Sequence, residues 1–146
     1  MSGTETDVQP GAPLDVGGRE EEEAAPENLG LWAITIVLAI IYVASGVPKL
    51  ESLEFISARF EEVWGFPDWF RMAIGGMEFI GGILLIIPGT AFYAALMLSV
   101  IMLGATYTHL VLGNPVFTPI PVTCFVLLMI VAYARRPEWL RADHEA

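Results

Sequence analysis

The chain has 146 residues, of which 55% are hydrophobic and only 16% are charged, whereas a soluble domain carries about 25% charged residues. Its formal net charge is −10, but eight of the 17 acidic residues lie between Glu5 and Glu27, so this charge belongs mainly to a tail. The lack of a clustered basic face argues against nucleic acid as a partner. Cys124 is the only cysteine, which excludes an intrachain disulfide, a CxxC redox pair and a four-cysteine metal site. We expect no metal centre.

Residues 1–28 are rich in glycine, proline and glutamate and nearly free of aromatic residues. Such a segment buries too little apolar surface to offset the entropy lost on ordering, and we predict a disordered acidic tail. The segment has no basic n-region, and the apolar run that follows is too long for the h-region of a signal peptide.

Four apolar stretches follow, and each is close to the roughly 20 residues needed to cross the core of a bilayer. They are 29–47, 72–89, 90–112 and 121–134, the last with a possible start at Val116. Gly46 and Pro48 are expected to close the first span. Buried soluble helices could explain one such stretch but not four in so short a chain. The sequence therefore predicts an all-α membrane protein, a four-transmembrane-helix bundle in residues 29–139, with a lipid bilayer around it and a short tail at 140–146.

The connection between the first two spans has a pattern of its own. Apolar residues recur at helical spacing from Leu50 to Trp64, with acidic residues mostly between them. This pattern is typical of an amphipathic helix at the membrane interface. The sequence "WGFPDWF" that follows is typical of an aromatic belt.

An even number of spans places both termini on one side of the membrane. Arg135, Arg136 and Arg141 follow the last span, and Lys49, Arg59 and Arg71 lie on the other side. The positive-inside rule gives a small preference for cytoplasmic termini in the cell membrane.

Glu78 is the one acidic residue inside a predicted span, and a charge there costs several kcal/mol unless it is paired or solvated. Gly75, Glu78 and Gly82 share one helix face, so a neighbouring helix could approach closely and bury the carboxyl group. We expect Glu78 to point into the bundle.

Two further spans bring polar groups to the same half of the bundle. Tyr42, Ser45, Gly46 and Lys49 form a small and polar stripe at the end of the first span. Thr106 and His109 lie on the small-residue face of the third. Lys49, Glu78 and His109 are therefore our candidates for ligand binding or proton relay, with Tyr42, Ser45, Gly46, Gly75, Gly82 and Thr106 in support.

Simpler interpretations stay open at each position. Lys49 could be an interface anchor, His109 a polar group near a span end, and Glu78 structural glue paired to Lys49. Cys124 is interpreted as a packing residue, and no catalytic residue is assigned.

The segments "ASGVPKL", "GFPDWF", "IGGMEFIGG", "ATYTHL" and "AYARRPEW" resemble the DoxX-like family of small four-helix membrane proteins, over roughly 29–139. The resemblance implies a bundle in the cytoplasmic membrane of a prokaryote. The family's name comes from a small subunit of a thiosulfate:quinone oxidoreductase. Gly46, Lys49, Glu78 and His109 match its recurrent glycine and polar positions.

Three functions follow from these observations. The first is an accessory or quinone-interacting subunit of a membrane oxidoreductase, at most non-catalytic or quinone-binding itself, with redox-enzyme subunits or further copies of the chain as partners. Lys49 and His109 could donate hydrogen bonds to a quinone, and Glu78 could relay protons. The alternatives are a membrane scaffold or assembly factor and a small proton-coupled transporter, for which four spans are few.

Overall fold

The computed structural model describes residues 25–141, and within this range the chain forms helices and turns but no strand. The two predicted tails, 1–28 and 140–146, fall almost entirely outside it. The described part includes residues 25–28 of the first tail, because the first helix begins at Ala25, and residues 140–141 of the second, because the last helix runs to Arg141.

Four long helices and five short ones make up the described chain. The long helices are α1 (Ala25–Leu50), α3 (Asp68–Ile86), α4 (Ala91–Tyr107) and α5 (Pro119–Ala134). The short elements are α2 (Glu54–Ala58), the π-helical η1 (Arg59–Val63) and η2 (Thr108–Leu112), the 3₁₀ turn η3 (Pro115–Phe117) and α6 (Glu138–Arg141). Four stretches, 29–50, 68–86, 91–112 and 115–134, are long and apolar enough to cross a membrane. The predicted all-α bundle of four spans is confirmed.

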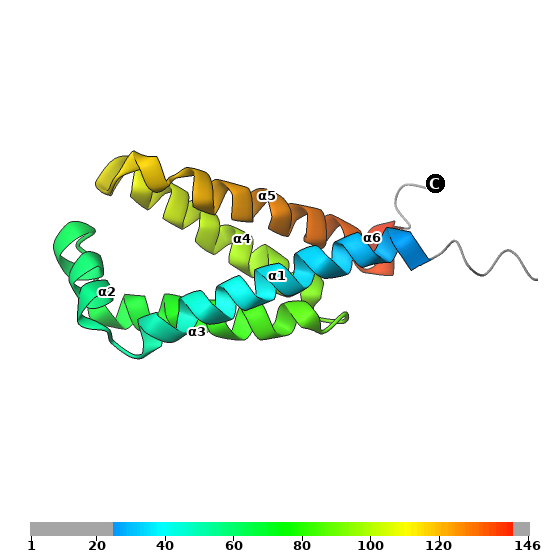
Figure 1. The fold of residues 1–146 in the computed structure, drawn as a ribbon, viewed down its shortest axis with the longest axis horizontal. Coiled ribbons are helices and arrows are strands. Elements are labelled where there is room, and N and C mark those ends of the chain that lie inside the picture. The colour runs from blue at the N-terminus through cyan, green and yellow to red at the C-terminus, as the bar shows by residue number, and fades with distance from the viewer. Residues whose placement is uncertain (1–24, 142–146) are drawn as a thin grey trace, which may run out of the picture.

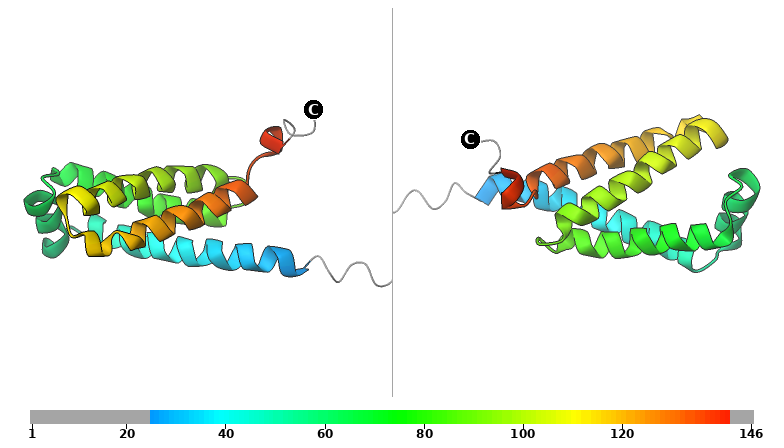
Figure 2. Two further views of the ribbon diagram at one scale, coloured as in Figure 1. Left: turned by 90° about the horizontal axis from the view of Figure 1, so that it is seen from above. Right: turned by 180° about the vertical axis from the view of Figure 1, so that it is seen from behind.

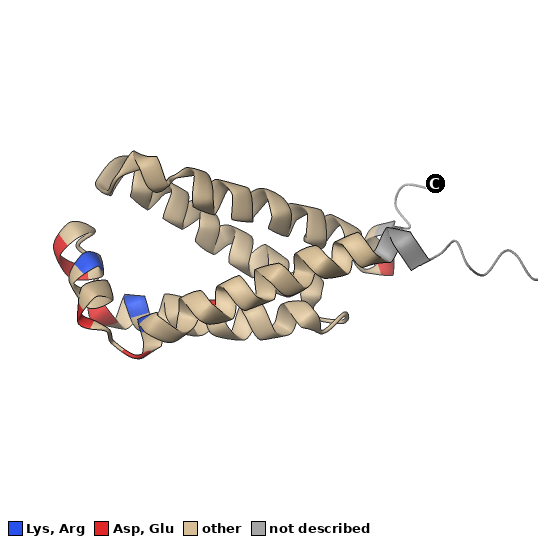
Figure 3. Ribbon diagram, viewed as in Figure 1, with Lys and Arg blue, Asp and Glu red and all other residues tan. Residues whose placement is uncertain are grey.

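The outer surface of the bundle is apolar. Val37, Ile40, Val100 and Tyr133 are each more than half exposed, as are many other large apolar residues. Charged residues gather at the α2 end and recur at α6, and the long helices are almost free of them along their length (Figure 3). This surface suits lipid, where helices satisfy their own backbone hydrogen bonds.

The first span continues past the point where the glycine and proline were expected to close it. α1 runs through Pro48 to Leu50, and the amide of Glu51 still donates to the carbonyl of Val47 at 2.9 Å. A proline removes one hydrogen bond from a helix, but the bonds that follow it are made, so the helix gains a further turn. Lys49 consequently lies inside a helix and not in a loop.

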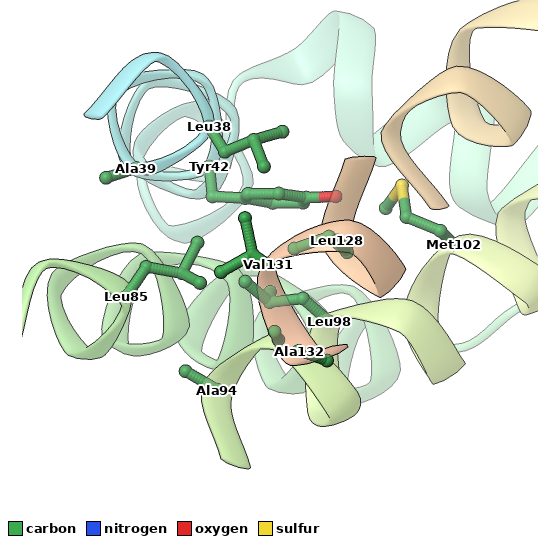
Figure 4. Packing of buried hydrophobic residues seen from close by; sticks show 11 residues of the cluster. Leu38, Ala39, Tyr42, Leu85, Ala94, Leu98, Met102, Leu128, Val131 and Ala132 are labelled. Carbon is green, nitrogen blue, oxygen red and sulfur yellow. The ribbon is translucent and has the colours of Figure 1, made fainter. Parts of the chain in front are cut away.

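The helices pack as two pairs that diverge. α1 packs along α3, and α4 packs along α5 (Figure 1). The pairs meet at the end where α3 turns into α4 and separate toward the α2 end, as the view from behind also shows (Figure 2, right). The buried apolar core draws residues from all four long helices, including Leu38, Leu98 and Leu128 (Figure 4).

Three glycines bring α1 and α3 together. A Cβ atom added at Gly46 would lie 2.7 Å from the carbonyl oxygen of Gly75, and one at Gly82 would lie 2.9 Å from the carbonyl oxygen of Ala39. Backbone atoms cannot give way at such distances, so only glycine allows the two helices to pack this closely.

The segment between the first two spans crosses the open end of the bundle. The predicted amphipathic helix is present as α2 and η1. Together they are shorter than the sequence pattern indicates. The apolar side of the segment contacts the bundle, since Phe60 is buried and Trp64 packs edge-on against His109 of η2, with ring centroids 5.6 Å apart. The segment thus forms a cap over the space between the diverging pairs.

Candidate functional site

A cavity of about 710 Å³ lies between the two helix pairs, toward the capped end. Its walls come from α1, α3, α4, η2 and α5, with aromatic residues from the cap segment. Most of its lining is apolar, and its polar groups belong to Tyr42, Ser45, Lys49, Trp64, Glu78, Tyr107, Thr108, His109 and Cys124. Sites for small molecules have this size and this balance of many apolar and few polar groups.

Lys49 and Glu78 form an ion pair on the cavity wall. The Lys49 Nζ lies 2.5 Å from the Glu78 Oε2, and the two side chains are 16% and 4% exposed. The last turn of α1 and the middle of α3 meet here because their glycines permit it. A Cβ at Gly75 would lie 2.7 Å from the Cβ of Lys49. Because residue 75 is a glycine, Lys49 has room to reach the carboxylate of Glu78.

Ser45 joins the pair into a small network. Its hydroxyl donates to the Glu78 Oε2 at 2.9 Å and accepts from the Lys49 Nζ at 2.7 Å. The ammonium also donates to the Ser45 carbonyl at 3.2 Å. A lysine ammonium has three N–H groups, and here all three are taken by Ser45 and Glu78.

The carboxylate of Glu78 keeps one oxygen for other partners. Both hydrogen bonds that it accepts go to Oε2. No described residue donates to Oε1, and Glu78 lines the cavity. Oε1 is therefore the acceptor that this network leaves available to a ligand or to water.

His109 lines the same cavity but does not touch the ion pair. Its ring lies edge-on to Trp64, with centroids 5.6 Å apart, and 6.3 Å from the ring of Phe117. Its Nδ1 is buried and has no hydrogen-bond partner among the described residues. It belongs to η2, a π-helical turn, and such turns frequently occur at functional sites. The structure thus pairs Lys49 with Glu78 and places His109 on another part of the wall.

Of the residues predicted to support the site, some line the cavity and others pack the helices together. Tyr42 and Ser45 line the cavity, whereas Gly46, Gly75 and Gly82 form the contact between α1 and α3. The Thr106 hydroxyl donates to the Met102 carbonyl of its own helix at 2.7 Å, and Thr106 is not part of the lining.

The aromatic side of the cavity was not predicted as part of the site. Phe60, Trp64, Phe66 and Phe70 all line it, although "WGFPDWF" was interpreted as an interfacial belt. The signal that could have revealed them is the helical spacing of Phe60 and Trp64, which puts both on one face.

Arg71 also has a role that its sequence position did not indicate. Its guanidinium is fully buried and donates to the Asp68 Oδ1 at 2.8 and 2.5 Å and to the Ser52 hydroxyl at 2.8 Å. Ser52 has a positive φ of 54° in the turn after α1. The arginine fixes this turn to the start of α3 and so helps to place Lys49.

Fold and site together define a four-span membrane protein with a polar network on the wall of an intramembrane cavity. The profile of the DoxX-like family matches residues 33–132, which include Lys49, Glu78 and His109. The chain belongs to the DoxX-like family. Comparisons with curated proteins and with solved structures give no match.

Proposed function

We propose that this DoxX-like membrane protein binds a quinone in the cavity, as an accessory subunit of a membrane oxidoreductase system. The single observation that carries the proposal is the 710 Å³ cavity with Lys49, Glu78 and His109 on its walls. A quinone combines an apolar tail with a flat ring that bears two carbonyl oxygens. An apolar cavity inside the membrane with a few polar groups suits such a molecule.

The side chains of the cavity have distinct parts in this proposal. Lys49 holds the carboxylate of Glu78 in place within the bundle. Glu78 offers Oε1 to a quinol hydroxyl or to a water on a proton route. His109 is a second hydrogen-bonding group on the wall. In this proposal the electrons come from a partner redox subunit.

The main alternative is a scaffold without a ligand, and one observation favours it. The Lys49–Ser45–Glu78 network is satisfied largely within α1 and α3, as expected of glue between helices. In a scaffold the cavity would be incidental, and small molecules would not bind there saturably.

We further propose that the protein lies in the cell membrane with both termini in the cytoplasm. The start of α1 and the end of α5 lie at the same end of the bundle (Figure 1). There the guanidinium of Arg135 stacks over Trp32 at 4.4 Å and that of Arg136 over Tyr133 at 4.1 Å. Aromatic rings with arginines suit a cytoplasmic interface. A reporter active only in the cytoplasm, fused to the C-terminus, should be active, and its inactivity would reverse the orientation.

Binding can be measured with the tryptophan of the cavity. Trp64 lines the cavity, and quinones quench tryptophan fluorescence at short range. Titration of the purified protein in detergent with decylubiquinone should give saturable quenching. In Trp64→Phe the saturable part should disappear, and only the linear quenching of the other tryptophans should remain. Quenching that never saturates in the wild type would contradict the proposal and favour the scaffold.

A further inference from the structure

The inner end of the cavity carries a polar group that the ion-pair network does not use. Tyr42 is 2% exposed, and its hydroxyl is buried without a hydrogen bond of ordinary geometry. It lies on α1 one turn deeper than Ser45, about 4.5 Å along the helix axis. The ring extends from α1 with its oxygen turned toward Leu128 and Met102 (Figure 4). Met102 and Tyr42 both line the cavity.

No described residue accepts a hydrogen bond from this hydroxyl. Its polar neighbours are the Cys124 thiol, whose sulfur is only a weak acceptor, and the Glu78 carboxylate, to which it makes no hydrogen bond. A hydroxyl left without a partner in apolar surroundings is costly, and phenylalanine would fill the same space without this cost. The presence of tyrosine at this position is explained if a ligand in the cavity accepts a hydrogen bond from the hydroxyl.

Lys49 is not available as a hydrogen-bond donor to a ligand. Its three N–H groups are already used by Ser45 and Glu78, so it cannot donate to a ligand unless the network breaks. Among the described residues, the Tyr42 hydroxyl is an unpaired O–H donor in the cavity lining. Two other lining groups that have no described partner, the Trp64 indole N–H and the His109 imidazole, lie in a different part of the wall, against each other.

We propose that Tyr42 donates a hydrogen bond to a carbonyl oxygen of the bound ligand. This inference rests on the proposed function and extends it, since it sets the position of the headgroup. The ring of the quinone enters past the ion pair to the inner end of the cavity, and its tail lies toward the outer, aromatic end. Tyr42 is then a binding residue of the ligand site, and Lys49 a positioning residue that acts through Glu78.

Tyr42→Phe tests the inference because it keeps the ring and removes only the hydroxyl. Loss of one neutral hydrogen bond should weaken decylubiquinone binding about threefold to tenfold, measured by the quenching of Trp64. Thermal stability should stay equal or rise, because the buried hydroxyl has no good partner. Tyr93→Phe is the matched control, since Tyr93 is 57% exposed and not part of the lining; it should bind as the wild type does.

A spectroscopic readout separates a hydrogen bond from a change of shape. Infrared difference spectra of bound quinone should show a carbonyl stretch shifted to lower wavenumber in the wild type and in Tyr93→Phe, and this shift should be lost in Tyr42→Phe. If the wild type binds quinone and Tyr42→Phe keeps both the affinity and the shifted band, the inference is overturned and the proposed function stands. If the wild type binds no quinone, the proposed function fails and the inference fails with it.

Discussion

At the scale of single residues, the site is built around the ion pair of Lys49 and Glu78. Their contact of 2.5 Å is made inside a span, with side chains only 16% and 4% exposed. Removing one partner of a buried pair leaves the other charge uncompensated, whereas replacing both with apolar residues is often nearly neutral. The two cases can therefore be told apart by mutation.

We expect Lys49→Met to destabilise the protein by about 3–5 kcal/mol, because the carboxylate of Glu78 loses its counter-charge. The double variant Lys49→Met/Glu78→Met should recover most of this loss. Thermal unfolding in detergent, followed by circular dichroism, measures both. A double variant as unstable as the single one would show that the pair does not act as a unit.

Helical spacing alone predicted part of this network. Ser45 and Lys49 are four residues apart on one face, and the cost of a charge in lipid indicated that Glu78 points inward. The sequence could not show that Ser45 occupies two donors of Lys49, because this depends on side-chain rotamers. For the same reason Tyr42 was grouped with the supporting residues and not seen as a free donor.

At the scale of elements, the glycines of α1 and α3 decide whether the ion pair can form. A Cβ at Gly46 would meet the carbonyl oxygen of Gly75 at 2.7 Å and the amide nitrogen of Phe79 at 2.8 Å. These are backbone atoms, so the helices themselves would have to separate. By contrast, a Cβ at Gly76, on the same helix as Gly75, meets nothing within 4 Å.

Gly46→Ala should therefore destabilise the protein by about 1–3 kcal/mol, the range typical of overpacking. Gly76→Ala is the control and should be neutral or slightly stabilising. The comparison uses the same thermal unfolding measurement for both variants. Equal stability of the two would mean that α1 and α3 do not depend on this close contact.

The boundaries of the elements were harder to predict than their number. Pro48 was expected to end the first span, but α1 includes it because the following turn is still hydrogen-bonded. The sequence of the segment after it predicts one amphipathic helix, but η1 is π-helical, and Phe60 of η1 is buried. Apolar residues that face lipid and those that face protein look alike in sequence, so periodicity cannot separate the two.

At the scale of the whole molecule, the arrangement of the two helix pairs makes the cavity. Four spans and their directions follow from the hydropathy of the chain. The divergence of the pairs does not, because it depends on which helices pack closely: α1 with α3 through glycines, and α4 with α5. The cavity is the space that this unequal packing leaves at the α2 end, and the cap of α2 and η1 covers it.

One glycine allows the cavity to be filled without disturbing this packing. Gly104 lies on α4, lines the cavity and is exposed, and a Cβ there meets nothing within 4 Å. A phenylalanine at this position has room at the cavity wall and should obstruct it. Gly76→Phe is the matched control, because Gly76 has equal room but does not line the cavity.

The most direct test of quinone binding in the cavity is the affinity of Gly104→Phe for decylubiquinone, measured by the saturable quenching of Trp64. We expect at least about a tenfold loss of affinity, equivalent to about 1.4 kcal/mol, while Gly76→Phe binds as the wild type does and both variants keep their helical content. Unchanged saturable binding in Gly104→Phe would contradict the account, because the ligand would then lie outside the space between the two helix pairs.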